Sequence, residues 1–325
     1  MQNPFVVHLL IYLVSFVGIW IGSGFVIKSI EVLSRKIKVS SFAISFLVLG
    51  FFTSIGELSV GVNSVMERDP EIYVGNLIGA SVVIFLLVIP LLAILGNSIH
   101  ISSEFRGFNL AASLIVVAIP AVSVMDGSVS MSDGIISLIL FGFLLFSIQM
   151  KKGLIERIED FNKDFALRLK NELLKIIFGV VVVFAASHFI VQETLYFASA
   201  LSVSPFLISL LMVSIGTNIP ELSLVVRSMF VRNHQVAFGD YVGSACFNTF
   251  LFGFLTKIYN QRFYLSNSYV VSLLFLIVGL VAFYFFAKSK NTISRLEGLF
   301  LIILYILFIF TEVYLHESLM FWNKM

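Results

Sequence analysis

Long apolar runs separated by short polar segments make up almost the whole chain. Each run lasts for about 20 residues or more, the length that a helix needs to cross the ~30 Å hydrocarbon core of a bilayer. Ten membrane-spanning helices are predicted, over residues 5–27, 39–66, 72–95, 107–125, 131–149, 171–192, 199–229, 236–258, 266–287 and 296–315. The runs are continuous and do not alternate as the short strands of a membrane barrel do. The pattern therefore predicts an all-α polytopic membrane protein.

Composition and charge agree with this prediction and orient the chain. Hydrophobic residues make up 59% of the sequence and charged residues 12%, and the mean hydropathy is +1.02. If alternate loops lie on the same side, 17 Lys and Arg residues fall on one side and 4 on the other. Because basic loops stay in the cytosol, this bias predicts that both termini lie outside and that the linker 151–170 is cytosolic.

A segment of the first half recurs in the second half. Residues 53–79 align without a gap to residues 217–243 at a constant offset of 164, and ten of the 27 positions are identical. Five predicted helices precede the linker and five follow it, so the two copies enter the membrane from opposite sides. The sequence thus predicts two inverted five-helix repeats, residues 1–150 and 171–325, joined by a short cytosolic linker, residues 151–170. Such repeats place matching polar segments near the bilayer midplane in secondary transporters.

Glu57 lies within a predicted span, and the repeat pairs it with Glu221. A carboxylate at the helix centre costs at least ~2.5 kcal/mol in a membrane, which indicates a functional site. Residues three and four positions earlier share the helical face of each glutamate. They are Ser54 and Thr53 in the first copy, and Asn218 and Thr217 in the second. Pro220 lacks an N–H and predicts a break in the second helix, whereas Gly56 predicts a weaker kink in the first.

Two further polar segments lie in the third and eighth predicted spans. Glycines at four-residue spacing, at 75 and 79 and again at 239 and 243, predict close helix packing. Ser244 and Asn248 share one helical face and can reach the same midplane site. Carboxylates, hydroxyls and amides together form an all-oxygen site, which hard cations such as Ca²⁺ and Na⁺ prefer.

These motifs resemble the α-repeats of the sodium/calcium exchangers, within the cation/calcium antiporters. The family pattern is G-T-S-x-P-E followed by G-N-x-x-G-S-N-x-x-N/D, and this chain has GTNIPE at 216–221 and GDYVGSACFN at 239–248. The separation of 18 residues from Glu57 to Gly75 is the same from Glu221 to Gly239. The resemblance covers both repeats and the ten-span plan, and it indicates a divergent member of prokaryotic type.

The resemblance implies an antiporter that exchanges Ca²⁺ for Na⁺ by alternating access, with the first and sixth spans sliding across the site. In the family, the two glutamates and the neighbouring threonine carbonyls bind Ca²⁺, and the serines and the last Asn or Asp complete the Na⁺ sites. The residues implied by position are Thr53, Ser54, Glu57, Thr217, Asn218, Glu221, Ser244 and Asn248.

The chain departs from the family pattern at several positions. Ala80 and Ile84 stand where the first copy should have oxygen ligands, and Asn218 replaces a serine. At least one Na⁺ site is therefore expected to be weak or absent. Asp240 replaces an asparagine, and it is interpreted either as a solvated carboxylate at the start of a helix or as an added proton-titrating group. Ser81, one residue after Ala80, is a possible substitute ligand.

These departures keep two alternatives open: a proton-coupled antiporter of Ca²⁺ or another divalent cation, and a degenerate relative that does not transport. An enzyme is not predicted, because no nucleophile with a matched base and no metal-binding histidine set occurs. The expected partners are inorganic cations and the lipid bilayer. No cofactor, no nucleic acid and no obligate protein partner is expected, and the expected location is a prokaryotic inner membrane.

Overall fold

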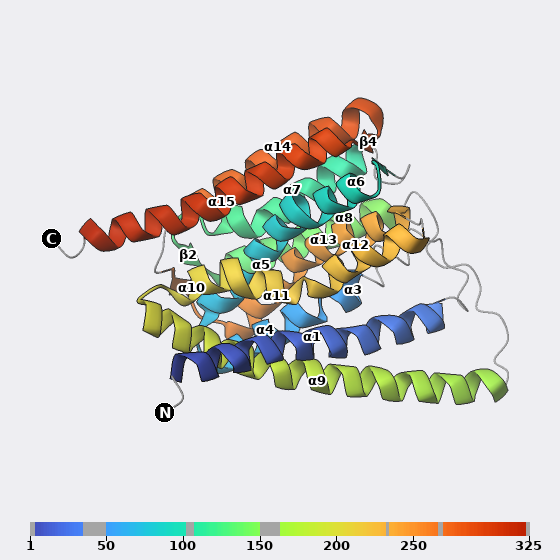
Figure 1. The fold of residues 1–325 in the computed structure, drawn as a ribbon, viewed down its shortest axis with the longest axis horizontal. Helices are drawn as coiled ribbons and strands as arrows, with labels where there is room; N and C mark the ends of the chain where they lie inside the picture. The colour runs from blue at the N-terminus through green and yellow to red at the C-terminus, as the bar shows by residue number, and fades with distance from the viewer. Residues whose placement is uncertain are drawn as a thin grey trace.

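The computed structural model describes residues 4–34, 50–101, 107–149, 163–231, 234–265 and 269–322. Figure 1 shows a layered bundle of helices with two short strand pairs at its ends. The elements of the first half are α1 (Pro4–Ser34), α3 (Gly50–Thr53), α4 (Ile55–Met66), α5 (Pro70–Val83), the π-helical turn η2 (Ile84–Val88), α6 (Ile89–Leu95), β1 (Ile99–His100), α7 (Phe108–Ser123), β2 (Ser128–Val129) and α8 (Met131–Gln149). Those of the second half are α9 (Lys163–Leu201), α10 (Pro205–Ile208), the π-helical turn η4 (Ser209–Val213), α11 (Ser214–Thr217), α12 (Ile219–Val231), α13 (His234–Tyr259), β3 (Phe263–Tyr264), α14 (Val270–Lys290), β4 (Thr292–Ile293) and α15 (Arg295–Trp322).

Helices occupy most of each predicted span where it is described, but α9 runs on to Leu201, so the helix predicted to start at residue 199 starts at Pro205. Residues 39–49 and 266–268 of the predicted ranges lie outside the described part of the chain. Within the described ranges, six helices are long and apolar enough to cross a membrane, or seven if the bent pair 205–217 and 219–225 forms one span. The prediction of an all-helical membrane protein is confirmed.

The bundle has a buried centre and two outer layers (Figure 1). In the centre α13 packs against α5, α7 and α8, and every residue of α5 is buried. On one side of this centre α1 and α9 lie together along much of their length, and on the other side α14 packs against α15. Because α5 and α13 are surrounded by other helices, polar side chains on them are kept away from lipid.

Short antiparallel strand pairs tie the two halves together at opposite ends of the bundle (Figure 1). At one end β1 pairs with β4, with Ile99 opposite Ile293, and at the other end β2 pairs with β3, with Val129 opposite Phe263. Each pair joins a loop of the first half to a loop of the second half.

The sixth helix begins earlier than the sequence predicted. The predicted span starts at residue 171, but α9 begins at Lys163 and runs for 39 residues. The last part of the 151–170 linker is therefore a continuation of this helix, and residues 151–162 lie outside the described part of the chain. Residues 163–170 include Ala, Leu, Lys and Arg, which are good helix formers, so a helix can extend past its apolar portion.

Candidate functional site

Both glutamate-bearing helices are interrupted just before their glutamate. Ser54 separates α3 from α4, and Asn218 separates α11 from α12, where the chain bends by 43°. Pro220 is the second residue of α12, a position where its missing N–H causes no loss within the new helix. The break predicted from Pro220 is confirmed, and the first copy is also broken, at Ser54.

All eight residues predicted for the site are fully buried. Each has 0% exposed surface: Thr53, Ser54, Glu57, Thr217, Asn218, Glu221, Ser244 and Asn248. They come from both interrupted helices and from α13. The packing is close enough that a Cβ atom added at Gly56 would lie 3.6 Å from the Thr217 carbonyl oxygen, so the two interruptions face each other.

Ser244 links the two copies of the motif. Its hydroxyl oxygen lies 3.0 Å from that of Ser54, and it donates a hydrogen bond of 3.2 Å to Oε1 of Glu221. The Asn218 side chain is held by its own helix, because its Nδ2 donates to the Ser214 carbonyl oxygen at 2.7 Å. One serine of α13 therefore contacts residues from both interrupted helices.

The two threonines make matching contacts in the two copies. Thr53 Oγ1 donates to Asp240 Oδ1 at 3.4 Å, and Thr217 Oγ1 donates to Asn76 Oδ1 at 3.2 Å. Thr217 follows Thr53, and Asp240 follows Asn76, by the same offset of 164 residues. Each threonine is thus held by the helix that carries the second motif of the other half.

Several polar atoms of this cluster, most of them oxygens, are buried without a hydrogen bond of ordinary geometry to the described residues. They are both carboxylate oxygens of Glu57, Oε2 of Glu221, Oδ1 of Asn218 and both polar atoms of the Asn248 amide. A buried acceptor without a donor costs about 1–3 kcal/mol, more when it is charged. Coordination of a hard cation would satisfy these oxygens.

The charges of the site are all negative. Glu57 and Asp240 are both close enough to Glu221 to interact with it electrostatically. Among the described residues, no group of three or more His, Cys, Asp or Glu side chains could hold one metal ion. A cation here would therefore rely on hydroxyl, amide and backbone oxygens in addition to one or two carboxylates.

The structure corrects one interpretation of Asp240 and identifies one further residue. Asp240 is only 1% exposed and lies six residues inside α13, so the interpretation as a solvated carboxylate at the helix start is wrong. Asn76, which sequence reasoning did not select, belongs to the cluster through Thr217. The signal was present, since Asn76 and Asp240 occupy matching positions in the repeat. The Ser81 hydroxyl donates to the Leu77 carbonyl oxygen of its own helix at 3.1 Å.

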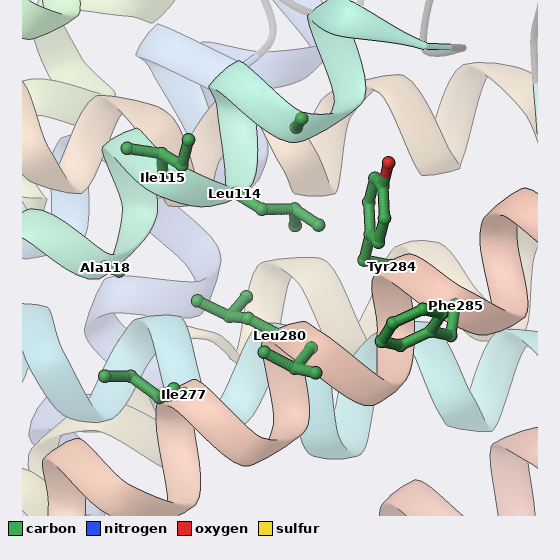
Figure 2. A pocket seen from close by; sticks show the side chains of 9 residues that line it. Leu114, Ile115, Ala118, Ile277, Leu280, Tyr284 and Phe285 are labelled. Atoms are coloured by element: carbon green, nitrogen blue, oxygen red, sulfur yellow. The ribbon is translucent and has the colours of Figure 1, made fainter.

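Two cavities lie at different positions relative to the buried cluster: one lies apart from it and one lies beside it. The first, of about 350 Å³, lies between α7 and α14 and is lined almost wholly by apolar groups such as Leu114, Ile277 and Leu280 (Figure 2). Its lining contains no charged side chain, and its hydroxyl comes from Tyr284. The second, of about 450 Å³, lies between α1 and α12, with Lys28 and Ser223 in its lining, and it reaches Pro220, the neighbour of Glu221.

Comparison with known proteins places the chain among membrane transporters. Residues 7–149 and 172–314 match the family described as sodium/calcium exchanger protein. An uncharacterized membrane protein of Methanocaldococcus jannaschii is 27% identical over 91% of this chain and 95% of its own length. The sodium/calcium exchanger MaX1 of Methanosarcina acetivorans is 24% identical over 95% of this chain and 99% of its own length.

Solved structures of the sodium-calcium exchanger NCX_Mj have the same fold. One, from a crystal soaked with Na⁺ and Sr²⁺, superposes with a TM-score of 0.67 at 25% identity and covers 92% of this chain and 96% of the exchanger. Another, soaked without Na⁺ and Ca²⁺, gives a TM-score of 0.63 at 25% identity over 93% and 97% of the two chains.

Proposed function

Because the chain belongs to the sodium/calcium exchanger protein family, we propose that it exchanges Ca²⁺ for Na⁺ at a buried site built on Glu57 and Glu221. The family consists of integral membrane transporters, and cation/calcium antiport is its class of activity. One observation carries the assignment of the site. Both oxygens of Glu57 and Oε2 of Glu221 are fully buried, and none of the three receives a hydrogen bond of ordinary geometry from a described residue.

The proposed ligands are oxygens from both halves. The carboxylates of Glu57 and Glu221 would bind Ca²⁺ directly, and two negative charges balance one divalent cation or two monovalent cations. The remaining oxygens would serve both ions: those of Thr53, Ser54, Thr217, Asn218, Ser244 and Asn248. Competition of Ca²⁺ and Na⁺ for the same carboxylates would couple the movement of one ion to the other.

We propose that ten membrane-spanning helices form two inverted five-helix repeats, residues 1–150 and 171–325, joined by residues 151–170. Matching contacts support this symmetry. A Cβ atom at Gly79 would lie 2.7 Å from Ser214 Cβ, and one at Gly50 would lie 2.8 Å from the Gly243 carbonyl carbon. Gly243 follows Gly79, and Ser214 follows Gly50, by the offset of 164 that relates the repeats.

Alternating access would be provided by α1 and α9, the first and sixth spans. These helices pack along each other on one side of the bundle, and α4 also packs against α9 (Figure 1). The cavity between α1 and α12 ends beside Pro220, so a movement of α1 would change access to Glu221. With basic loops in the cytosol of a prokaryotic cell, this cavity would open toward the cytosolic side.

The test is Ca²⁺ uptake into proteoliposomes. Vesicles loaded with Na⁺ are expected to take up ⁴⁵Ca²⁺, and vesicles loaded with K⁺ are not. Glu57→Gln and Glu221→Gln keep the shape of the side chain but remove the charge, and each should abolish uptake. Glu312→Gln is the matched control, because Glu312 is also buried within a helix but bonds Ser272 on α14, outside the candidate site.

Proton-coupled transport is the second candidate, favoured by Ala80 and Ile84, which are buried and offer no oxygen ligand. Uptake that follows an imposed pH gradient and ignores internal Na⁺ would establish it. If neither gradient drives uptake, and the Gln variants match the wild-type protein, the assignment of Ca²⁺ transport to this chain is wrong.

A further inference from the structure

Pro120 lies inside α7 and leaves one backbone carbonyl of that helix without its usual donor. Proline has no N–H, so it cannot bond the carbonyl oxygen four residues earlier, which belongs to Val116. Thr249 of α13 supplies a donor in its place. Its Oγ1 donates to the Val116 carbonyl oxygen at 2.7 Å, and both residues are buried. The irregular turn of α7 is therefore joined to α13 by a side-chain hydrogen bond.

A second, weaker contact joins the same two helices close by. Cys246 Sγ donates to the Ser113 carbonyl oxygen at 3.7 Å, and Cys246 is fully buried. Cys246 and Thr249 are three residues apart on α13, and their acceptors are three residues apart on α7. Residues at this spacing lie on one helical face. The two hydrogen bonds together therefore oppose a rotation of α13 about its own axis.

Rotation of α13 matters because another of its faces carries predicted site residues. Ser244 and Asn248 share that face. At about 100° per residue, it is turned by roughly 150° from the face of Cys246 and Thr249. Asn248 is fully buried, and neither polar atom of its amide makes a hydrogen bond of ordinary geometry to the described residues. The direction of this side chain therefore depends on the rotation of the helix.

The matching positions of the first half hold neither the proline nor the hydroxyl partner. At the offset of 164 residues, Phe85 stands in the place of Thr249, and Tyr284 stands in that of Pro120. Phe85 packs edge-on against a phenylalanine ring of α14, with the ring centroids 5.0 Å apart. The ligand positions matching those of α13 are also apolar in this half, at residues 80 and 84. The hydrogen bond between neighbouring helices thus occurs in the half that carries the polar ligands.

We infer that Thr249 is a positioning residue: its hydrogen bond to α7 sets the rotation of α13 and thereby directs Ser244 and Asn248 into the cation site. The inference rests on the cation site proposed above. Pro120 takes part as well, because any other residue there would bring an N–H that competes for the Val116 carbonyl oxygen. The hydrogen bond from α13 would then weaken, although α7 itself would become a more regular helix.

The experiment measures cation binding to purified protein in detergent. A bound cation stabilises the folded state, so the unfolding temperature is followed against Na⁺ or Ca²⁺ concentration at constant ionic strength. The Na⁺ concentration that gives half-maximal exchange in proteoliposomes is measured in parallel. Thr249→Val keeps the shape of the side chain but removes the hydroxyl. It should raise the half-saturating concentrations about fivefold, the effect of one lost hydrogen bond, whereas Thr249→Ser should stay close to the wild-type protein.

Pro120→Ala separates positioning from stability. Alanine restores the N–H and removes a proline from a helix interior, so the unfolding temperature without added cation should rise. Cation binding should nevertheless weaken, by a factor no larger than that of Thr249→Val. The double variant should bind cations as weakly as Thr249→Val alone, because both changes act on the same contact. If the role of Thr249 were only structural, the restored N–H would compensate for the lost hydroxyl, and the double variant would bind as the wild-type protein does.

Thr256→Val is the matched control on the same helix. The Thr256 hydroxyl is buried and lies 2.9 Å from the Tyr73 hydroxyl oxygen on α5, away from α7. The same substitution there also removes one buried hydrogen bond. It should lower the unfolding temperature without added cation, but it should leave the half-saturating cation concentrations unchanged.

The outcomes separate this inference from the proposed exchange. If the wild-type protein exchanges the ions and Thr249→Val keeps the wild-type half-saturating concentrations, Thr249 does not position the site although exchange is established. If the wild-type protein shows no Na⁺-dependent uptake, but its cation binding is weakened by Thr249→Val and equally by the double variant, the positioning role stands and the proposed exchange does not. If cations neither stabilise the wild-type protein nor are exchanged by it, both are wrong.

Discussion

Replacing Gly79 by alanine tests whether the close contact between α5 and the second interrupted helix maintains the site. Gly79 faces the segment 210–214, and a Cβ atom there would overlap the Leu210 carbonyl oxygen and lie 2.7 Å from Ser214 Cβ. Neither neighbour is the end of a flexible side chain. Ordinary contact begins at 3.4 Å, so relief of the Ser214 contact alone requires the helices to separate by about 0.7 Å, and the closer Leu210 carbonyl oxygen requires more.

Such a separation has two consequences. Overpacking of a buried contact costs typically ~1–3 kcal/mol in stability. It also acts on the site, because Asn76 lies three residues before Gly79 on α5 and accepts the hydrogen bond from Thr217 at 3.2 Å. Adding about 0.7 Å to that distance exceeds the ~3.5 Å limit of a hydrogen bond. We expect Gly79→Ala to lower both the unfolding temperature and the rate of Ca²⁺ uptake.

The assay is thermal unfolding of purified protein in detergent, followed by uptake into proteoliposomes. Gly142→Ala in α8 is the matched control, because a Cβ atom at Gly142 has no neighbour within 4 Å. That change should raise the unfolding temperature slightly, since alanine is favoured over glycine in a helix by ~0.8–1 kcal/mol. Equal unfolding temperatures and equal uptake for Gly79→Ala and Gly142→Ala would refute the role of the close contact.

Three smaller predictions concern other parts of the molecule. Burial raises the pKa of Asp69, in the turn between α4 and α5, to about 6, and the charge of Glu71 adds to the effect. Because this pKa is higher in the folded protein than in the unfolded chain, protonated Asp69 favours the folded state. That stabilisation is fully present below pH ~4 and is lost as the pH rises through ~6. Asp69→Asn should therefore unfold at a higher temperature than the wild-type protein at pH 7.5 but not at pH 4, and the same difference at both pH values would contradict this. His8 Nδ1 lies 2.8 Å from Oε2 of the buried Glu193 and joins α1 to α9, so His8→Ala should cost ~1–3 kcal/mol in urea or thermal unfolding by leaving that carboxylate unpaired. Ser244→Ala should raise the Na⁺ concentration that gives half-maximal exchange about tenfold, because one hydroxyl ligand is removed. A tenfold change corresponds to the loss of ~1.4 kcal/mol of binding free energy. An unchanged Na⁺ concentration would show that Ser244 is not part of the cation site.

The sequence predicted the helices well because long apolar runs are their direct signal. The sequence also selected the residues of the candidate site, because a carboxylate within a membrane span is conspicuous and the repeat identified its partner. Glu57, Glu221 and the six polar residues predicted with them are all buried, and their side chains come from three neighbouring segments. The start of α9 was less predictable, since the end of an apolar run does not mark the end of a helix.

The position of Asp240 could not be predicted from local sequence. The predicted span begins at residue 236, so Asp240 is expected close to a helix start, where the helix dipole favours negative charge. Its hydrogen-bond partner Thr53 is 187 residues away in the chain. Only the packing of α13 against α3 shows that this carboxylate is buried. In the same way, only the contact between α5 and α11 shows that Asn76 belongs to the cluster, through its hydrogen bond with Thr217.

The two halves of the molecule share backbone contacts, but their side chains differ at many matching positions, three of which follow one face of α5 and η2 in the first half and of α13 in the second. The pairs are Asn76 and Asp240, Ala80 and Ser244, and Ile84 and Asn248. Glycine contacts between the interrupted helices and α5 or α13 fix the symmetric frame, because a Cβ atom at Gly50, Gly75 or Gly79 would meet backbone atoms of the other half. Each half therefore has to keep these glycines and the close helix contacts that they allow, but side chains at the other positions can gain or lose oxygen atoms without disturbing those contacts. If the chain exchanges ions at Glu57 and Glu221 as proposed, substitution of the polar residues of α13 should alter cation binding while leaving the helix packing in place. Substitution of the glycines should instead alter the packing and the site together.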